Sequence, residues 1–346
     1  MARADITVRG AGIFGLSIAW ACVQRGARVQ IVDPFGALAG SSGGTVGALS
    51  PHVPENWNEK KAFQLESLLM AADFWTEVEA VGGVSADYSR SGRLQPVADE
   101  AALTLARGRC ETARGLWGDA AVWEVIPAQE VGPWAPVSPS GWLIRDSLSA
   151  RIAPRRAGAA LISALAVRGV AVVPEALDEG AVIWATGWQG LGALSEALGR
   201  NMGTGIKGQA VLLKHDAGDV AQIFAGGLHI VPHGDGTVAI GSTSERAFDD
   251  PLATDAGCDE LVARAVEVMP VLRGAAELER WAGVRARARS RAPMLGDWPE
   301  RPGHFIANGG FKIGFGMAPG VARGMADLVL DGRDAIPEGF RVEASL

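Results

Sequence analysis

Three glycines near the amino terminus have the spacing of a dinucleotide-binding loop. Gly10, Gly12 and Gly15 fit the pattern G-x-G-x-x-G. In such a loop the first glycine permits a tight turn, the second lets the backbone approach a pyrophosphate, and the third lets helix and strand pack closely. Asp33 follows at the end of the next predicted strand, where a carboxylate can hold ribose hydroxyl groups. The motif fits FAD and NAD equally, and Asp33 argues against NADP because it would repel the 2′-phosphate.

The elements that must position this loop are predicted from its neighbours. The pattern indicates a short buried strand over Ile6–Val8, a helix over Leu16–Arg25 and a second strand over Val29–Asp33. Gly26 stands where a C′ glycine ends a helix. We therefore predict a βαβ unit with a right-handed crossover. Its helix start at residues 11–13 would offer free N–H groups and a positive dipole end to phosphates.

The rest of the chain predicts further strands and helices around this unit. Helices are expected over 59–81, 153–168, 255–268 and 319–330, with Pro319 in the first turn of the last one, and an Ala-rich helical stretch before 141. Strands are expected over 83–98, 141–144, 170–173, 181–184, 208–214, 228–233, 237–242, 281–289 and 304–308. We predict an α/β protein in which a Rossmann-like nucleotide-binding domain (1–80, 141–205 and 283–346) carries a smaller antiparallel-sheet α+β substrate domain (81–140 and 206–282).

Composition narrows the class of protein. The 346 residues have a formal net charge of −7, which opposes a dedicated nucleic-acid binder. The three cysteines, Cys22, Cys110 and Cys258, form no CxxC pair, so neither a disulfide framework nor a zinc site is expected, and no metal is predicted. No run of 18 apolar residues is present, which predicts the absence of a membrane span. The low cysteine count suits a reducing cytoplasm.

Five stretches in shared order make the chain similar to the D-amino-acid oxidase, glycine oxidase and sarcosine oxidase family of flavoproteins. They are the glycine loop with Asp33; Ser41-Ser42 leading to Gly47-Ala48-Leu49-Ser50-Pro51; Tyr88 to Leu94; 170–173 followed by Val182 to Gly187; and a carboxy-terminal set made of Trp281 to Arg285, Ala292-Pro293, Asn308 to Gly314 and Ala318-Pro319. Residues 231–236 and 240–243 resemble the family's substrate-domain hairpin. The resemblance covers nearly the whole chain.

The resemblance implies FAD as the cofactor, held without a covalent bond because no cysteine lies near 309–314 or 285–293. Electrons would pass to oxygen or another acceptor. The carboxy-terminal glycine loop and the last helix would aim N–H groups at the pyrimidine edge of the flavin. The implied cofactor contacts are Gly10, Ala11, Gly12, Ile13, Phe14, Gly15, Asp33, Ser41, Ser42, Gly47, Ala48, Leu49, Val173, Ala185, Thr186, Gly187, Trp188, Gly283, Gly309, Gly310, Phe311, Lys312 and Ile313.

The resemblance also implies an amine substrate that bears a carboxylate. Lys312 and Arg285 match the positions where relatives place a cation, and His52 is a third candidate for substrate contact. No catalytic side chain is predicted, because flavin oxidises a neutral amine by hydride transfer without a separate base. Two departures stand out. The arginine that follows the serine loop in sarcosine oxidases is missing, and Gly310 replaces a common histidine, which predicts open space near the flavin.

Three other functions compete with an amino-acid oxidase. The first is the flavin subunit of a multi-subunit dehydrogenase, which would need a partner chain, while the oxidase would act alone or as a homo-oligomer. The second is the FAD domain of a tRNA-modifying enzyme, which the acidic charge opposes. The third is a flavin binder without activity, suggested by Gly310 and the missing arginine.

Overall fold

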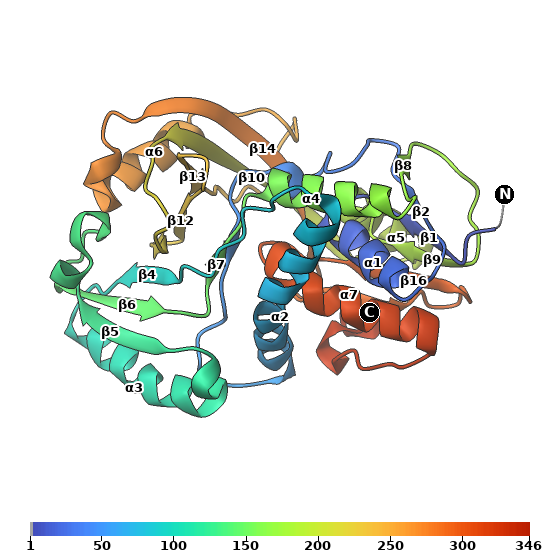
Figure 1. Cartoon of the computed structure of the whole chain (residues 1–346), viewed down its shortest axis with the longest axis horizontal. Helices are drawn as coiled ribbons and strands as arrows, with labels where there is room; N and C mark the ends of the chain where they lie inside the picture. The colour runs from blue at the N-terminus through green and yellow to red at the C-terminus, as the bar shows by residue number, and fades with distance from the viewer. Residues whose placement is uncertain (1–2) are drawn as a thin grey trace.

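The computed structural model describes residues 3–346, which form two halves around two large sheets (Figure 1). The sheet of the right-hand half has six strands in the order β15-β16-β9-β1-β2-β8. All neighbours are parallel except β15 and β16, which are antiparallel. The strands are β1 (Ile6–Arg9), β2 (Val29–Val32), β8 (Val172–Val173), β9 (Ala181–Trp184), β15 (Met294–Asp297) and β16 (His304–Asn308). This is the Rossmann-like sheet that the sequence predicted.

The βαβ unit at the start of the chain is confirmed. Helix α1 (Ile13–Gln24) links β1 to the parallel strand β2. It begins three residues earlier than predicted, because the carbonyl of Gly12 already accepts the N–H of Leu16. Gly26 adopts a φ of +83° just after the helix, as its predicted C′ position requires. The glycine loop therefore leads directly into a helix N-terminus.

The left-hand half contains an eight-stranded, mainly antiparallel sheet in the order β14-β10-β13-β12-β11-β4-β6-β5. Its strands are β4 (Arg93–Pro96), β5 (Trp123–Pro127), β6 (Trp142–Asp146), β10 (Gly203–Lys214), β11 (Gln222–Ala225), β12 (Leu228–Pro232), β13 (Thr237–Gly241) and β14 (Ala276–Ala288). Helices α3 (Glu100–Trp117) and α6 (Gly257–Val268) pack on it. A short pair, β3 (Ala48–Leu49) and β7 (Ala150–Arg151), lies near the junction of the halves.

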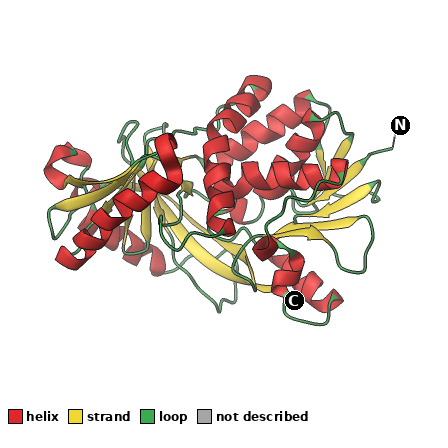
Figure 2. Cartoon of the chain, turned by 90° about the horizontal axis from the view of Figure 1, so that it is seen from below, coloured by secondary structure: helices red, strands yellow, loops and turns green. Residues whose placement is uncertain are grey.

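Four helices gather beside the parallel sheet (Figure 2): α1, α2 (Glu59–Gly82), α4 (Pro154–Val167) and α7 (Gly314–Asp331). Asn58 caps α2 by accepting the N–H of Lys61, and Gly83 ends it at a φ of +65°. Within residues 3–346 no helix has the length and apolar content needed to cross a bilayer.

The last helix corrects one prediction. Pro319 lies inside α7 and not in its first turn, since the helix begins at Gly314. A proline there interrupts the helical hydrogen-bond ladder. Beside the proline, the Ser67 hydroxyl of α2 donates to the carbonyl of Gly316 (2.7 Å) and accepts from the N–H of Gly320 (3.0 Å). The two helices are thereby fixed to each other around the proline.

Strands β10 and β14 connect the two halves along the top of the molecule (Figure 1). They pair antiparallel from Gly203–Ala288 to Lys214–Ala276. Their right-hand ends share an apolar cluster with α5 (Gly187–Ala197), β15 and β16, including Leu191, Ala286 and Ile306. The connection places the Trp281–Arg285 stretch between the two sheets.

Candidate functional site

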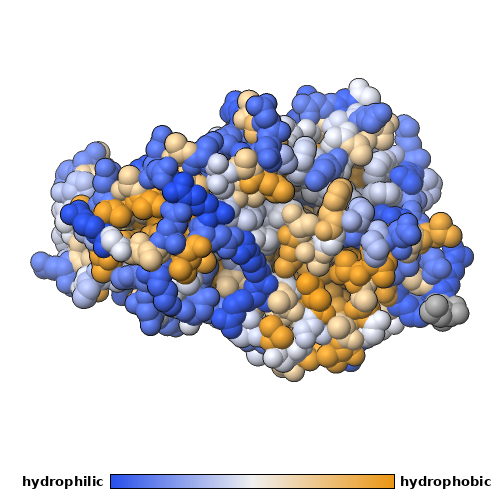
Figure 3. All heavy atoms as spheres, turned by 90° about the horizontal axis from the view of Figure 1, so that it is seen from above, coloured by the Kyte–Doolittle hydropathy of each residue, from blue (hydrophilic) through white to orange (hydrophobic). Residues whose placement is uncertain are grey.

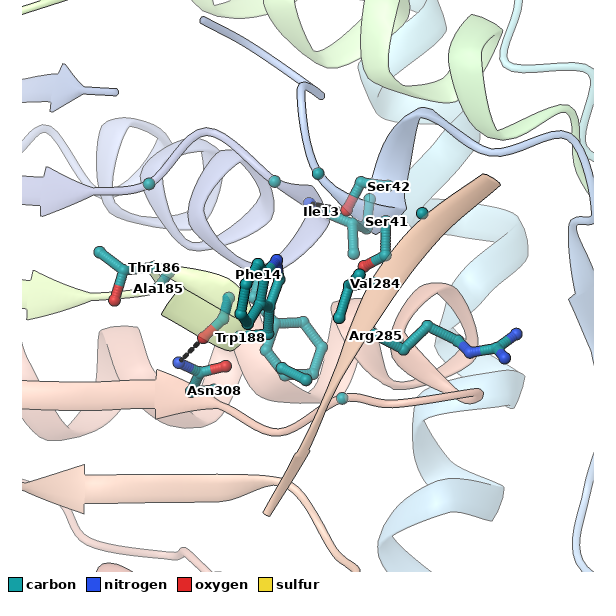
Figure 4. Close-up of a pocket in the computed structure, with 18 of the residues that line it drawn as sticks. Ile13, Phe14, Ser41, Ser42, Ala185, Thr186, Trp188, Val284, Arg285 and Asn308 are labelled. Atoms are coloured by element: carbon teal, nitrogen blue, oxygen red, sulfur yellow. Dashed lines mark hydrogen bonds between the residues drawn. The ribbon is translucent and has the colours of Figure 1, made fainter. Parts of the chain in front are cut away.

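A long cavity of about 760 Å³ runs between the two halves. Its walls come from the α1 loop, the 41–48 segment, the start of α5, strand β14 and the loop before α7 (Figure 4). At one end Phe35 and Leu252 line it although both are largely exposed. Seen from above, apolar side chains reach the surface of both halves, over a broader area on the half that carries the parallel sheet (Figure 3). The lining of the cavity thus combines several of the segments that the sequence motifs identified.

The N-terminus of α1 opens onto this cavity. The N–H of Ile13 donates to Ser42 Oγ at 2.9 Å, a bond drawn in Figure 4. The N–H groups of Gly12 and Phe14 have no partner among the described residues, and the first turn contains no acidic residue. Free N–H groups and an uncompensated helix dipole attract an anion such as a diphosphate.

The three glycines of the loop have separate tasks. Gly10 has a φ of +105°, and a Cβ there would lie 2.3 Å from the carbonyl oxygen of Ala185. A Cβ on Gly15 would lie 1.9 Å from the carbonyl oxygen of Gly10. At Gly12 the nearest atom would be Ser42 Oγ at 3.2 Å. The first and third glycines thus permit close packing, while the second keeps the loop open toward the cavity.

Asp33 lies at the cavity edge, half-buried at the end of β2. Its Oδ2 accepts the N–H of Ala11 at 2.8 Å, and its Oδ1 accepts the N–H of Phe35 at 3.0 Å. These bonds fix the carboxylate beside the glycine loop. Each oxygen keeps a further lone pair for a ligand hydroxyl group.

The N-terminus of α7 faces the same cavity close to that of α1, since a Cβ on Gly314 would lie 3.5 Å from Cγ2 of Ile13. Gly310, Lys312 and Gly314 line it, and their N–H groups have no partner among residues 3–346. No side chain caps the helix, and its first turn has no acidic residue. Two helix N-termini, those of α1 and α7, therefore present positive potential to one cavity.

Asn308 ties the start of α5 to the loop before α7. Its Nδ2 donates to the carbonyl of Gly187 at 2.8 Å, and its Oδ1 accepts the N–H of Gly309 at 2.7 Å (Figure 4). This bridge fixes Trp188 and Gly310 in the same wall. Sequence reasoning quoted Asn308 within a motif but did not select it as a site residue.

Two cations, Arg285 and Lys312, line the cavity near the N-terminus of α7, and both lie within 6 Å of the centre of the Phe311 ring. Arg285 donates to Ser242 Oγ (2.7 Å) and to the carbonyl of Thr243 (2.8 Å), and its buried Nε has no partner. Its side chain points away from Phe14 and Trp188 in Figure 4. Burial lowers the pKa of Arg285 to about 10. The pKa of Lys312 is also lowered, first by burial and then by the charge of Arg285.

The space predicted at Gly310 is filled, which corrects that expectation. A Cβ on Gly310 would lie 2.8 Å from Cζ of Phe14. The aromatic ring of the α1 loop thus occupies the volume that the missing side chain leaves.

A smaller cavity of about 160 Å³ lies beside the first. His52, Leu49 and Ile313 line this smaller cavity and not the larger one. The partner of His52 is uncharged: its Nδ1 and its backbone N–H both contact Oε1 of Gln64, at 2.5 and 2.8 Å. Lys312, Ala48 and His229 line both cavities.

Four of the predicted contact residues line neither cavity: Ala11, Gly15, Val173 and Gly309. Ala11 and Gly15 are packed within the α1 loop. The carbonyl of Val173 accepts the N–H of Asp33 and so supports that carboxylate from behind. Gly309 has a φ of +74° and shapes the loop before α7. All other predicted contact residues line at least one cavity.

Several cavity residues were not selected from the sequence. Trp281 lies over Gly283, where a Cβ would come within 2.5 Å of its ring. The guanidinium of Arg9 lies over the ring of Trp184, 5.8 Å from the ring centre. His229, on β12, is neutral because burial, then Arg93, then Lys312 lower its pKa to about 3. In the sequence, the glycine of the W-x-G pattern could have pointed to Trp281 as a cavity residue. A single histidine on a strand, such as His229, does not by itself indicate a site.

Comparison with known proteins relates this geometry to a family. A family profile described as FAD dependent oxidoreductase (DAO) matches residues 5–328. The glycine oxidase of Pseudomonas aeruginosa is 33% identical over 132 residues, a stretch that covers 38% of this chain and 36% of that protein. The glycine oxidase of Geobacillus kaustophilus is 26% identical, covering 94% of this chain and 93% of that protein.

A solved structure extends the comparison to the fold. The crystal structure of glycine oxidase from Geobacillus kaustophilus superposes with a TM-score of 0.87 at 21% identity, and the match covers 99% of both chains. At this identity the match establishes the architecture of the two halves and leaves substrate and activity to the site itself.

Proposed function

Because the chain belongs to the DAO family of FAD-dependent oxidoreductases, we propose that it oxidises the C–N bond of a small amino acid or N-alkyl amino acid to an imine, which water then hydrolyses. The observation that carries this proposal is the meeting of Arg285 and Lys312 in the cavity end at which α7 begins. A pair of cations suits a substrate whose amine stands beside a carboxylate.

The residues of the larger cavity fit FAD. The cavity holds about 760 Å³ and is lined by two helix N-termini with free N–H groups. The α1 loop would hold the diphosphate, Asp33 the ribose, and the loop before α7 the ring system. None of the three cysteines lines either cavity, which supports a non-covalent cofactor. We assign the parallel-sheet half to FAD and the eight-stranded sheet to the substrate.

The side chains around Arg285 do the binding and orienting. Ser242 and the carbonyls of Lys207 and Thr243 hold the guanidinium in one place, and Nη1 keeps a second hydrogen for a carboxylate. Lys312 adds a point charge from the opposite loop. Bound FAD would supply the two-electron oxidant for removal of a hydride from the α-carbon. The positive potential at the α7 N-terminus stabilises negative charge at that end of the cavity.

Glycine is the first substrate to test, because both curated relatives described above are glycine oxidases. The test is anaerobic mixing of the purified holoprotein with glycine, sarcosine and a panel of D- and L-amino acids, while the visible absorbance of the flavin is followed. Bleaching by at least one amine is expected. If dithionite bleaches the flavin and no amine does, the proposed activity is wrong. A protein that purifies colourless and cannot be reconstituted with FAD would overturn the cofactor assignment.

A further inference from the structure

The smaller cavity adjoins the larger one where Lys312 lies. Both are lined by Ala48, His229 and Lys312. From this junction the smaller cavity extends toward Arg93 on β4 and Phe224 on β11. A molecule held at Lys312 therefore has space for a substituent on the side of the eight-stranded sheet. The volume of about 160 Å³ suits a group of a few atoms.

Arg93 gives this space a positive wall. Its side chain is buried, with 5% exposed, and its Nε donates to Oδ2 of Asp146 at 2.9 Å. Asp146 is fully buried and its other oxygen accepts the N–H of Ser149. Neither Nη of Arg93 has a hydrogen-bond partner in residues 3–346, and the guanidinium stands 5.9 Å from the ring centre of Phe224. One edge of Arg93 is thus anchored and the other is available to a ligand.

His229 lines the smaller cavity together with Arg93 and Lys312, and after burial their charges further lower the pKa of its ring. The two cations add to burial in keeping the imidazole neutral, and its buried Nδ1 has no partner. Its ring packs on Phe224 at 4.7 Å between centres. No aspartate or glutamate lines the smaller cavity. The cavity therefore has two cations facing it, a polar imidazole without a partner, and no negative side chain of its own.

A space with a buried arginine and a lysine in its lining and no carboxylate attracts an anionic group. A carboxylate entering it would pair with Arg93 through planar N–H donors and with Lys312 through its charge. An uncharged apolar substituent would leave those donors desolvated and unpaired, which carries a free-energy cost. The first carboxylate of the substrate is already assigned to Arg285 and Lys312. The anion in the smaller cavity is then a second acidic group.

Building on the proposed function, we propose that the smaller cavity binds a second carboxylate of the substrate, so that amino dicarboxylic acids are preferred over amino acids whose substituent is uncharged. The second carboxylate is carried either on the α-carbon, as in aspartate, or on the nitrogen, as in iminodiacetate. Arg93 is the specificity-determining residue, and Asp146 positions it.

The first experiment measures binding without turnover. Isothermal titration of the holoprotein with malonate and succinate, against acetate and propionate at constant ionic strength, should show at least tenfold tighter binding of one dianion. Equal affinities for dianions and monoanions would overturn the proposal. Because these ligands contain no amine, the result does not depend on whether the protein oxidises amines.

The second experiment compares substrates of matched size. Iminodiacetate is set against its monoamide, and aspartate against asparagine, in both stereochemical forms. At least one acid should exceed its amide at least tenfold in kcat/KM. If amides are oxidised as well as acids, the second-carboxylate proposal fails while the proposed oxidase function stands. If no amine is oxidised and malonate still binds tightly, the proposed function fails alone.

The third experiment removes the positive wall. Arg93→Met is combined with Asp146→Asn, because the single change would leave a buried carboxylate unpaired, and asparagine can still accept the N–H of Ser149. The acid-to-amide ratio should fall tenfold or more, and Arg93→Lys should retain part of it. Arg145→Met is the matched control, since Arg145 is next to Asp146 on β6 but is exposed and paired with Glu124. An unchanged ratio in a folded, FAD-containing Arg93→Met/Asp146→Asn protein would remove Arg93 from the site.

Discussion

The ring of Phe14 packs against Gly310, although the two residues are nearly 300 positions apart in the chain. A Cβ on Gly310 would lie 2.8 Å from Cζ and 3.2 Å from Cε2 of Phe14. The glycine loop at the start of α1 and the loop before α7 thereby fit each other. An aromatic residue in one loop and a missing side chain in the other are a single packing solution.

This contact predicts that Gly310→His fails unless Phe14 is also changed. The imidazole would have to displace the Phe14 ring, and overpacking of this kind costs about 1–3 kcal/mol. We expect Gly310→His to lose thermal stability and FAD affinity, and Phe14→Ile/Gly310→His to recover most of both. Gly192→Ala is the control, because a Cβ there meets nothing within 4 Å. If Gly310→His matches the original protein in melting temperature and FAD content, the two loops do not depend on each other in this way.

Asp33→Ala should weaken FAD binding. The carboxylate fixes the N–H of Ala11 and Phe35, so its removal loosens the loop and deletes the proposed ribose acceptor. Loss of a charged acceptor is worth about 1.5–3 kcal/mol, or roughly ten- to a hundredfold in affinity. Titration of apoprotein with FAD, followed by flavin fluorescence, measures it. Asp33→Asn, which retains one acceptor oxygen, should have an FAD affinity between those of the original protein and Asp33→Ala. Full FAD affinity in Asp33→Ala would exclude the ribose role.

The parts of the fold that local patterns specify were predicted well. The βαβ unit from Ile6 to Val32 was placed within a few residues, because strand, glycine turn and helix each carry a local signal. Helix α5 and strands β5, β11 and β15 were missed. The α5 segment begins with Gly187 and contains two more glycines, so its helical state comes from packing on β10 and β14 and not from propensity.

The site divides in the same way. Residues in motifs, such as Lys312 and Arg285, line the cavity as their positions suggested. His229 and Arg93 could not be selected, since their importance arises only when β12 and β4 come together across β11 in the sheet. Phe14 was expected at the cofactor, but its contact with Gly310 could not be foreseen. Contacts between distant segments carry no pattern in a single sequence.

Binding of a carboxylate should weaken at high pH through Lys312. Its pKa is lowered by burial and by Arg285, so the ammonium loses its proton at a lower pH than a free lysine does. Only the charged form attracts an anion, and acetate affinity should therefore fall as pH rises through that lowered pKa. Acetate is the probe because it has no amine of its own to titrate.

The Lys312 variants separate this effect from Arg285. Lys312→Met should bind acetate about tenfold more weakly at neutral pH, with the flavin retained. Its acetate affinity should not show the decrease that the titration of Lys312 causes in the original protein as pH rises. Lys312→Arg should move that decrease to higher pH, since a guanidinium keeps its proton longer. Identical pH profiles for the original protein and Lys312→Met would exclude Lys312 from the carboxylate site.

Ser67→Ala should destabilise the protein and loosen the N-terminus of α7. The hydroxyl bridges the carbonyl of Gly316 and the N–H of Gly320 around Pro319, so deletion removes two buried hydrogen bonds, worth about 1–3 kcal/mol together. Because α7 begins where we propose that the FAD ring binds, FAD affinity should fall together with the melting temperature. Thr104→Ala is the control: its hydroxyl also bonds a helix carbonyl, but it is exposed on α3. If the melting temperature of Ser67→Ala is no lower than that of Thr104→Ala, water replaces the hydroxyl beside the proline. The Ser67 contact from α2 would then not position the N-terminus of α7.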